Sequence, residues 1–515
     1  MHDLLITNAR IHTLDAARPL ARRMLVRAGR IAALDEAVPD AVDAPVLDLG
    51  GATVVPGLID SHVHLVWTGV RHFALRLAGV TTLAELRERL AAAAEQRAPG
   101  QLILGLDLDM EAFDPAPTAA DLDAVAPRHP VLLKGDTGHL TLANTLAMQH
   151  FAVGPTTPGW HADGRLIGAA NTAVAWRGPN EFAAAIGWER VLRAAAEEAA
   201  RVGLTTLHAL EGADAADDPG VRALLQQASR LPVRTVVYWQ TTHVAAAQAL
   251  SLPRIGGCIW IDGDFGPHTA ALKQPYADCP CTCGELYLSD ERLQAFVDAA
   301  HTAGLQIALH CVGDAAVAQV LRAYRRALER WPRADHRHRI EHFEVYDDDL
   351  LREARALGIA VALQPAFDGY FGGIAHNAQY LGWERAQRAD AIATFDRHGI
   401  PIGGGSDSTV TPLGPLYGMH CAVNHSNPRE RVTPERALRL WTIDNAYLAF
   451  EEHDKGSLAP GKLADFVALD ADPLAVAPAS IKDIQVRLTV MGGAITYQRA
   501  APDGNAAPAA RNAWP

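Results

Sequence analysis

The sequence predicts an α/β protein built on a (β/α)8 TIM barrel. Eight short apolar runs alternate with helical stretches rich in alanine, a pattern typical of parallel strands joined by helices. Several runs stop at a histidine or an aspartate, where barrel enzymes carry their functional groups. Both chain ends, in contrast, hold short strand-like segments with glycine turns, which predicts a second, smaller β-domain.

The predicted barrel strands follow one another along most of the chain. The first ends at His64, and the others are expected at 204–208, 233–238, 257–262, 305–310, 339–342, 359–364 and 400–407. Helical patterns separate several of them, at 189–202, 290–303, 315–330 and 384–398. Eight strand/helix units indicate a TIM barrel, whose functional sites lie at the C-terminal ends of the strands.

The remaining segments suggest how the domains are organised. Residues 1–52 and 456–498 read as two halves of one small antiparallel sheet domain, with the barrel at 53–455 inserted between them. Residues 70–200 do not fit the strand count and are expected to form an inserted subdomain after the first barrel strand, with strand-like pieces of its own at 102–105 and 131–134. Residues 499–515 are rich in alanine and proline and are expected to be a loose tail.

Composition excludes several classes of protein. The chain has 515 residues, 49% of them hydrophobic and 20% charged, which is ordinary for a globular protein. A net charge of −13 argues against nucleic-acid binding. Six cysteines form no disulfide framework, and neither a signal peptide nor a membrane span is recognised, so we expect a cytoplasmic protein with reduced thiols and no membrane partner.

The polar residues at the strand ends predict a metal site. His62 and His64 point to one face of the first strand, because side chains alternate along a strand. His310, His342 and Asp407 end three later strands, so all five side chains are expected at one mouth of the barrel. Neutral imidazole and carboxylate suit Zn²⁺, and also Fe²⁺ or Mn²⁺. A bound metal lowers the pKa of its water to about 7, and Asp407 could accept that proton and pass it to a leaving amine.

Seven motifs resemble one family of enzymes. They span nearly the whole chain in the same order: 56–64, 138–144, 262–272, 310–316, 339–342, 405–407 and 456–465. In these segments the sequence resembles the amidohydrolase superfamily, and more narrowly amidohydrolase family 3, the group like N-substituted formamide deformylase. The resemblance implies a TIM barrel, a composite β-sandwich domain made from both chain ends, and a long insertion after the first strand.

The resemblance also implies roles for the strand-end residues. His62 and His64 would bind one metal ion, while His310 and His342 would bind a second or complete a single site, with Asp407 as ligand and proton shuttle. Binuclear members often carry a carboxylated lysine on the fourth strand, and Cys258 stands at that position. A thiolate there could bind or bridge metal ions; alternatively the site holds one ion, and Cys258 is simply a small buried residue.

Further residues are expected around the substrate. In the resemblance, His139 and Asn144 belong to the pocket wall, where His139 could donate to the substrate carbonyl or its developing oxyanion. The alternative is that they cap a helix starting near Asn144. Asp262, Phe265 and His268 lie in a loop after the fourth strand and are expected to line the substrate site.

Two features remain open. Lys134 ends an apolar run and could be mistaken for the carboxylated lysine, but it belongs to the insertion rather than to the fourth barrel strand. The cluster of Cys279, Cys281 and Cys283 could bind a soft metal, but it lacks a second ligand group at zinc-finger spacing. A surface or lid loop is the favoured interpretation of this cluster.

These observations favour hydrolysis of an amide- or formamide-type C–N bond in a small molecule, with attack by a metal-activated hydroxide. The alternatives are a hydrolytic deaminase of a heterocycle, an esterase or lactonase using the same site, and a non-catalytic scaffold. A deaminase usually needs a glutamate acid near the metal, and Cys311 to Asp314 after the fifth strand supply none. The sequence does not identify the substrate, and a homodimer is implied only by the family.

Overall fold

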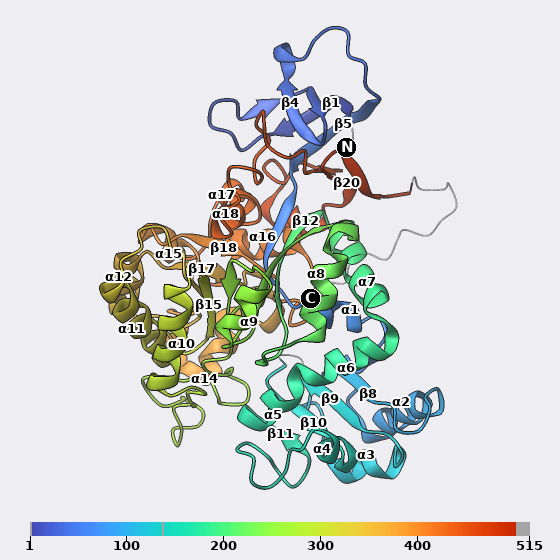
Figure 1. Ribbon diagram of the computed structural model, residues 1–515, viewed down its shortest axis with the longest axis vertical. Helices are drawn as coiled ribbons and strands as arrows, with labels where there is room; N and C mark the ends of the chain where they lie inside the picture. Colours follow the sequence, from blue (N-terminus) through green and yellow to red (C-terminus); the bar gives the residue numbers. More distant parts are fainter. Residues whose placement is uncertain (1–2, 136–137, 501–515) are drawn as a thin grey trace.

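Eight parallel strands form the centre of the computed structural model, which describes residues 3–135 and 138–500. Their order follows the chain: β6 (Leu58–Val63), β12 (Leu204–Glu211), β13 (Arg234–Trp239), β14 (Arg254–Ile255), β15 (Gln306–Cys311), β16 (Arg339–His342), β17 (Ala360–Leu363) and β18 (Ile402–Gly404). The predicted α/β fold with an eight-stranded parallel barrel is therefore confirmed. Figure 1 shows this barrel between a sheet at the top and the insertion at the bottom.

The barrel is closed where its first and last strands meet. The backbone N–H of Asp407 donates to His62 O at 2.8 Å, and that of His64 donates to Ser408 O at 3.0 Å. Gly405 permits this approach, because a Cβ at that position would lie 2.7 Å from the Cβ of His62. The closure therefore brings the two ends of the barrel sequence, with their polar motifs, into direct contact.

The fourth barrel strand differs from the prediction. It was expected at 257–262, but β14 covers only Arg254–Ile255. Gly256 and Gly257 turn the chain with φ of 96° and 61°, and a Cβ on Gly256 would lie 2.2 Å from Ala308 O. Beyond this turn only Trp260 bridges to His310 on β15, so Cys258 lies on an irregular segment after the strand.

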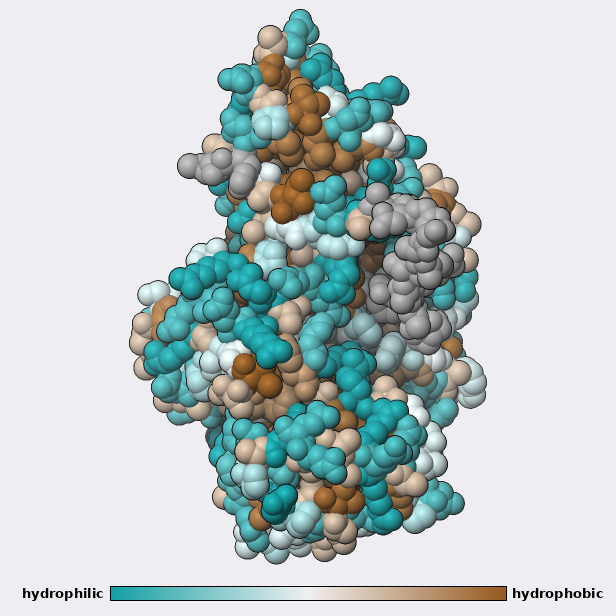
Figure 2. All heavy atoms as spheres, turned by 90° about the vertical axis from the view of Figure 1, so that its right-hand side faces the viewer, coloured by the Kyte–Doolittle hydropathy of each residue, from teal (hydrophilic) through white to brown (hydrophobic). Residues whose placement is uncertain are grey.

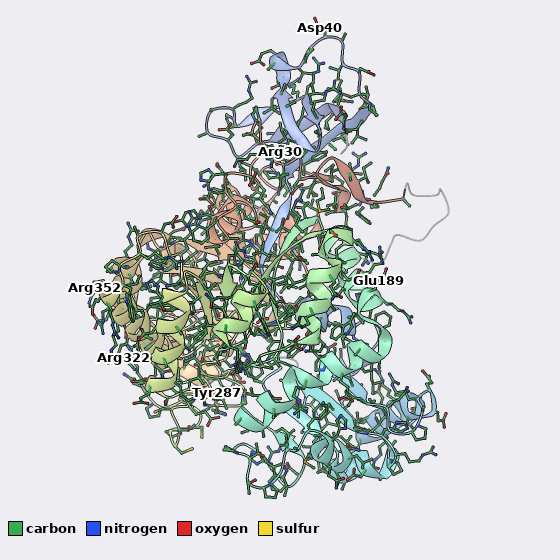
Figure 3. All side chains as sticks on the ribbon, in the orientation of Figure 1. Arg30, Asp40, Glu189, Tyr287, Arg322 and Arg352 are labelled. Carbon is green, nitrogen blue, oxygen red and sulfur yellow. The ribbon has the colours of Figure 1, made fainter. Side chains whose placement is uncertain are left out.

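Helices cover the outside of the barrel. Those that follow its strands are α1 (Leu65–Val70), α7 (Trp188–Arg201), α8 (Pro219–Gln227), α9 (Val244–Ala249), α10 (Asp290–Thr302), α11 (Asp314–Arg330), α12 (Asp348–Leu357), α13 (Ala366–Phe371), α14 (Gly373–Ala386), α15 (Ala393–Arg397), α16 (Pro415–Asn424), α17 (Pro434–Leu440) and α18 (Ile443–Leu448). Arg322 and Arg352, on α11 and α12, point away from the barrel (Figure 3). Among the described residues, no helix combines the length and the apolar character needed to cross a membrane.

One predicted helix was wrong. The stretch 384–398 was expected to be helical throughout, but α14 ends at Ala386 and α15 begins only at Ala393. Asp390 between them has φ of 52° and donates its N–H to Glu344 O at 3.1 Å. The chain therefore leaves the helical path here and returns to the mouth of the barrel.

Strands from both chain ends form one sheet. It contains β1 (Leu4–His12), β2 (Leu20–Ala21), β3 (Met24–Arg27), β4 (Arg30–Leu34), β5 (Val46–Pro56), β19 (Phe466–Leu469), β20 (Val486–Met491) and β21 (Ala494–Gln498). The antiparallel pairing of β5 with β19 joins the two ends of the chain. The sheet is mixed rather than antiparallel, because a loop after β4 returns the chain so that β5 runs parallel to β1. A two-layered sandwich stays a prediction.

Exposed apolar side chains gather on this sheet. Leu20, Val46 and Ile495, which belong to β2, β5 and β21, are 50%, 63% and 48% exposed. Figure 2 shows brown side chains on the upper part of the molecule, where the sheet lies. The expected tail falls almost entirely on residues 501–515, outside the described part of the chain.

The insertion has a sheet and a core of its own. Its strands, β7 (Leu75–Arg76), β8 (Ile103–Leu108), β9 (Val131–Gly135), β10 (Thr141–Ala143) and β11 (Arg165–Leu166), form one sheet in the order β11-β10-β9-β8-β7. They accompany α2 (Leu83–Glu95), α3 (Ala119–Val125), α4 (Thr145–His150), α5 (Gly168–Ala175) and α6 (Arg177–Ile186). The predicted strand-like piece 102–105 overlaps β8, and the piece 131–134 lies within β9. The insertion lies at the end of the barrel opposite to the mixed sheet (Figure 1).

Candidate metal centre

Three histidines surround one carboxylate at the mouth of the barrel. Asp407 Oδ1 lies 3.1 Å from His64 Nε2 and 3.4 Å from His62 Nε2, and Asp407 Oδ2 lies 4.0 Å from His342 Nε2. All four side chains are buried. Residues that are up to 345 positions apart in the sequence, from β6, β16 and the end of β18, thus present their polar atoms to one point.

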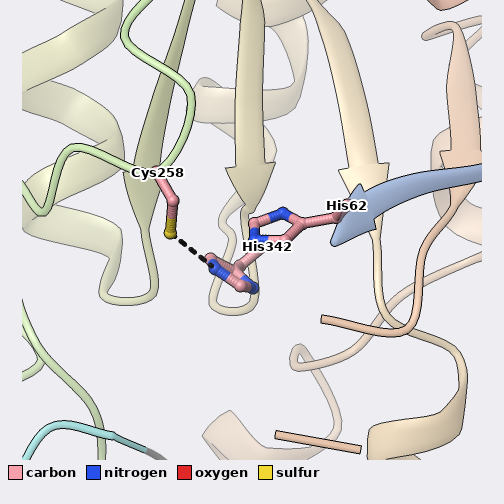
Figure 4. A group of neighbouring side chains, drawn as sticks. All are labelled: His62, Cys258 and His342. Atoms are coloured by element: carbon pink, nitrogen blue, oxygen red, sulfur yellow. Dashed lines mark hydrogen bonds between the residues drawn. The ribbon is translucent and has the colours of Figure 1, made fainter. Parts of the chain in front are cut away.

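Cys258 and His310 extend this cluster. Cys258 Sγ lies 3.6 Å from His310 Nδ1 and 4.0 Å from His342 Nε2. Figure 4 shows the thiol and His62 on either side of His342. Two sets of potential ligand atoms lie within 4.8 Å of one another, His62 with Cys258 and His342, and His62 with His64 and Asp407. All six residues predicted as metal ligands are therefore brought together.

The backbone turns sharply at two of these residues. His342, the last residue of β16, has a φ of 70°, and Asp407, three residues beyond the end of β18, has a φ of 54°. Non-glycine residues rarely adopt this left-handed conformation, and it costs roughly 1 kcal/mol or more. Such turns redirect a side chain from the strand into the barrel mouth, so the strain accompanies the aiming of both groups at the cluster.

Each of three imidazoles is held by its outer nitrogen. His62 Nδ1 donates to Glu341 Oε2 at 2.8 Å, His64 Nδ1 to Leu210 O at 2.9 Å, and His342 Nδ1 to Gln364 Oε1 at 2.7 Å. A proton fixed on Nδ1 leaves the lone pair of Nε2 facing the centre, as in metal-binding histidines. The three rings are thus oriented by the protein before any ligand arrives.

A buried ion pair supports His62 from below. Arg339 Nε and Nη2 donate to the two oxygens of Glu341 at 2.8 Å each, while Nη1 donates to Tyr238 Oη at 3.0 Å. Sequence reasoning assigned no role to Arg339 or Glu341. Their signal was present, because two charged residues alternate with Ile340 on a strand that is otherwise buried, which places both inside the barrel.

The charges of the cluster shift one another's titration. Burial by itself raises the pKa of Asp407, but the neighbouring His62 and His64 lower it by more. The pKa of this carboxyl group therefore lies well below its usual value. Burial also raises the pKa of the Cys258 thiol, and His310 and His342 lower it well below normal. The pKa of His62 moves up, since Asp407 and Cys258 outweigh its burial. The cluster therefore stabilises the charged forms of its groups, which are the Asp407 carboxylate, the Cys258 thiolate and the His62 imidazolium.

The donor set suits a divalent metal. Imidazole nitrogen, thiolate sulfur and carboxylate oxygen are the ligands that zinc prefers. Two of the central atoms, His62 Nε2 and Asp407 Oδ1, are buried and have no hydrogen-bond partner in the described protein. Buried polar atoms are normally satisfied, so these two atoms are arranged for something other than a protein partner.

Comparison with known proteins identifies the family. The model of the amidohydrolase family, family 3, matches residues 45–497. The chain belongs to the amidohydrolase family. The predicted resemblance is thereby confirmed.

Relatives of this amidohydrolase cover nearly its whole length. The N-substituted formamide deformylase of Arthrobacter pascens is 28% identical, over 97% of this chain and 99% of that protein. Protein LONG AFTER FAR-RED 3 of Arabidopsis thaliana is 31% identical, over 91% of this chain and 87% of that protein. The crystal structure of an uncharacterized metal-dependent hydrolase from Pyrococcus furiosus matches with a TM-score of 0.73 at 25% identity, over 92% of this chain and 100% of that one. This amidohydrolase is therefore a metal-dependent enzyme acting on carbon–nitrogen bonds other than peptide bonds.

A cavity of about 280 Å³ opens above the candidate metal centre of the amidohydrolase. Barrel loops and the insertion share its wall, which includes His139, Leu140, Asp264, Phe265, His310, His342, Glu344, Phe367, Phe371 and Asp407. The centroid of the His139 ring lies 4.4 Å from the ring centroid of Trp260 and 5.2 Å from that of His310. Burial and the nearby His310 lower the pKa of His139 well below its usual value, so its imidazole is neutral.

Three predicted substrate residues do not line this cavity. Asn144 begins α4, where its Oδ1 accepts from the N–H groups of Val131 and Ala147. The structure thus gives it the capping role that was the alternative interpretation. Asp262 is buried and accepts from three backbone N–H groups, those of Ala271, Val312 and Gly313, so it holds the loops that frame the site. His268 pairs with Asp278 near the surface.

Lys134 and the cysteine cluster lie outside the metal cluster. Lys134 Nζ is 4.4 Å from the centre of the Trp67 ring and has no hydrogen-bond partner in the described protein. Burial lowers the pKa of Lys134 to about 7. Cys279 Sγ lies 2.7 Å from Cys281 Sγ in a loop on which Cys281 and Cys283 are exposed. Neither group joins the sets of converging ligand atoms found among the described residues.

Proposed function

We propose that this amidohydrolase hydrolyses an amide- or formamide-type C–N bond of a small molecule, with Asp407 moving the proton. The observation that carries the proposal is the convergence of two ligand sets on the floor of the cavity. The relationship to an N-substituted formamide deformylase supports the choice of bond. The cavity volume of about 280 Å³ suits a small-molecule substrate.

In this proposal His62, His64, Cys258, His310, His342 and Asp407 would hold one or two divalent ions, with Zn²⁺ favoured over Fe²⁺ and Mn²⁺. Such an ion supplies a Lewis acid and lowers the pKa of water to about 7. His62 offers only Nε2, because its Nδ1 is bonded to Glu341. The two ligand sets share that single atom, so His62 serves one ion, and a second would rely on Cys258, His310 and His342.

The side chains around this centre divide the remaining work. Asp407 lines the cavity and reaches the centre, so its carboxylate can accept a proton there and release it to the departing amine. His139 approaches from the insertion, and its neutral imidazole can donate one hydrogen bond to the substrate carbonyl as negative charge develops. Phe265, Phe367 and Phe371 exclude water from the apolar part of the substrate.

A substrate panel on metal-reconstituted protein tests the proposal. Formamides and N-acyl amines should be hydrolysed with release of the amine, in proportion to the metal content measured by mass spectrometry. Aryl esters, cyclic imides and aminated heterocycles serve as comparisons. Turnover restricted to esters, or release of ammonia from heterocycles, would contradict the proposed reaction. The number of ions per chain, compared between the wild type and Cys258→Ser, decides whether the thiol holds metal.

A further inference from the structure

The cavity above the candidate metal centre is strongly acidic. Its wall carries the carboxylates of Asp264, Glu344 and Asp390 in addition to Asp407, and Asp109 and Glu111 stand at its rim. Among the described residues that line it, none is lysine or arginine. The basic groups of the wall are histidines, three of which, His139, His310 and His342, lie at or beside the metal cluster. Acidic side chains on this wall therefore have no fixed positive side chain beside them, and its only basic groups among the described residues are histidines.

Glu344 is the decisive group. It lies two residues beyond His342 and is only 7% exposed, yet its carboxylate makes no hydrogen bond or ion pair with any described residue. The backbone holds it there, because Glu344 O accepts from Asp390 N at 3.1 Å. Its carboxylate oxygens are not among the fully buried atoms without a partner, so they open onto the cavity rather than being sealed inside the protein. An unsatisfied carboxylate on a cavity wall indicates that the partner comes from the ligand.

Two neighbouring carboxylates, in contrast to Glu344, do have hydrogen-bond partners. Asp262 accepts three backbone N–H groups, and Asp390 accepts from Asn377 Nδ2 at 2.6 Å. The protein thus satisfies the acids that build its loops. Within the described residues, Glu344 also belongs to neither set of converging metal ligands. Its carboxylate remains available to a group that enters the cavity.

Aromatic rings complete the surroundings. The ring of Phe367 is stacked against His342 with 6.2 Å between centroids, and that of Phe265 is stacked against Tyr380 at 6.1 Å. All four residues line the cavity. Aromatic faces attract cations and accommodate flat apolar groups. An acidic wall beside aromatic rings fits a ligand that is apolar along its body and positively charged at one end.

We propose that the substrate carries a cationic nitrogen group, of the ammonium, amidinium or guanidinium type, which Glu344 binds while the bond to be cleaved lies over the metal centre. Asp264 and Asp390 strengthen the negative potential around it. This inference rests on the proposed hydrolase function and names the substrate class. A planar amidinium or guanidinium would form two parallel hydrogen bonds to the carboxylate.

Binding of a matched pair of probes tests the inference without turnover. Benzamidinium and benzamide have nearly the same shape but differ by one positive charge. Isothermal titration calorimetry on the metal-reconstituted enzyme should show benzamidinium binding about 10- to 100-fold more tightly. In Glu344→Gln this preference should fall to about 3-fold or less. It should stay unchanged in Glu88→Gln, which removes an exposed carboxylate of α2.

Equal binding of the two probes to the wild type would overturn the inference, and so would a preference that survives in Glu344→Gln. If Glu344→Gln does not fold, Asp264→Asn provides a second test, with a smaller expected drop of about 3-fold. Turnover separates this inference from the proposed function. The formamides of 4-methylbenzylamine and of 4-(aminomethyl)benzylamine differ only by a cationic group. Hydrolysis of both at the same kcat/KM supports the hydrolase function and refutes the cation site, whereas hydrolysis of neither refutes the function itself.

Discussion

The two buried cations near the active site have opposite surroundings. Arg339, inside the barrel, pairs with both oxygens of Glu341 and also donates to Tyr238 and to Ser61 O. Lys134, on β9 of the insertion, faces only the ring of Trp67. The charge of Arg339, below the metal cluster, is therefore paired with a carboxylate. The amine of Lys134, beside the cluster, has no hydrogen-bond partner among the described residues.

The difference shows how the two parts of the site are built. In the barrel, each charge holds another group in place, so the imidazoles are oriented without help from a ligand. A buried pair of this kind contributes little net stability, but the loss of one partner is costly. In the insertion, burial of an unpaired amine costs free energy that the local packing must offset. Changes in the two regions should therefore affect stability with opposite signs.

The largest effect is expected from Asp407, the group that the barrel supports. Asp407→Asn keeps the shape of the side chain but removes the charge that faces His62 and His64. We expect kcat to fall by about 1,000-fold, since loss of a proton-transferring group costs roughly 100- to 10,000-fold. The measurement is kcat for formamide hydrolysis at saturating metal, with circular dichroism as a check of the fold. Full turnover by this variant would exclude Asp407 as the proton shuttle.

The second effect concerns the compensated pair. Glu341→Gln leaves Arg339 buried beside a neutral amide and weakens the hold on His62 Nδ1. The free energy of unfolding in urea should fall by about 3 kcal/mol. Metal affinity should drop about 10- to 100-fold, as expected when a group that orients a metal ligand is lost.

An exposed ion pair provides the control for this variant. Asp349 and Arg352 pair on the surface of α12, and Asp349→Asn removes one partner there. We expect no measurable change in stability, because exposed ion pairs contribute little. If Glu341→Gln and Asp349→Asn changed the free energy of unfolding by the same amount, the buried pair would be no more important for stability than the exposed one.

The sequence predicted the metal cluster better than its surroundings. His62, His64, His310, His342 and Asp407 end strands, and strand ends meet at one mouth whatever the details of the barrel. Cys258 joined them by a different path, because Gly256 and Gly257 end the fourth strand early. The motif therefore placed Cys258 beside the histidines although the strand that was expected to carry it ends earlier.

The unpredicted features depend on contacts between distant segments. Asn144 caps α4 through Ala147 N, as the alternative interpretation had it, but its second bond, from Val131 N of β9, is one that no local pattern reveals. Glu344 has no partner among the described residues because the loops around it place no donor group near its carboxylate. The arrangement of these loops cannot be predicted from the sequence. Glu341 could have been found, since its charge alternates with apolar residues along β16.

The smallest effect concerns Lys134 and appears as a dependence of stability on pH. Burial lowers the pKa of Lys134 in the folded protein from 10.5 to about 7. Between these values the unfolded chain binds a proton that the folded protein does not, so this residue makes stability rise with pH. The slope from one group is at most about 1.4 kcal/mol per pH unit. Below about pH 7 both states are protonated, and the contribution to the slope disappears.

Lys134→Met tests this reasoning, because methionine keeps the apolar stem and removes the amine. The variant should be more stable than the wild type at pH 7, and the difference should shrink as the pH approaches 10. Urea unfolding at pH 7, 8.5 and 10 gives the slope for each protein. Lys273→Met is the matched control, since Lys273 is partly exposed and pairs with Asp347. A loss of stability in Lys134→Met at pH 7 would show that the buried amine is compensated after all, and the contrast with Arg339 would no longer hold.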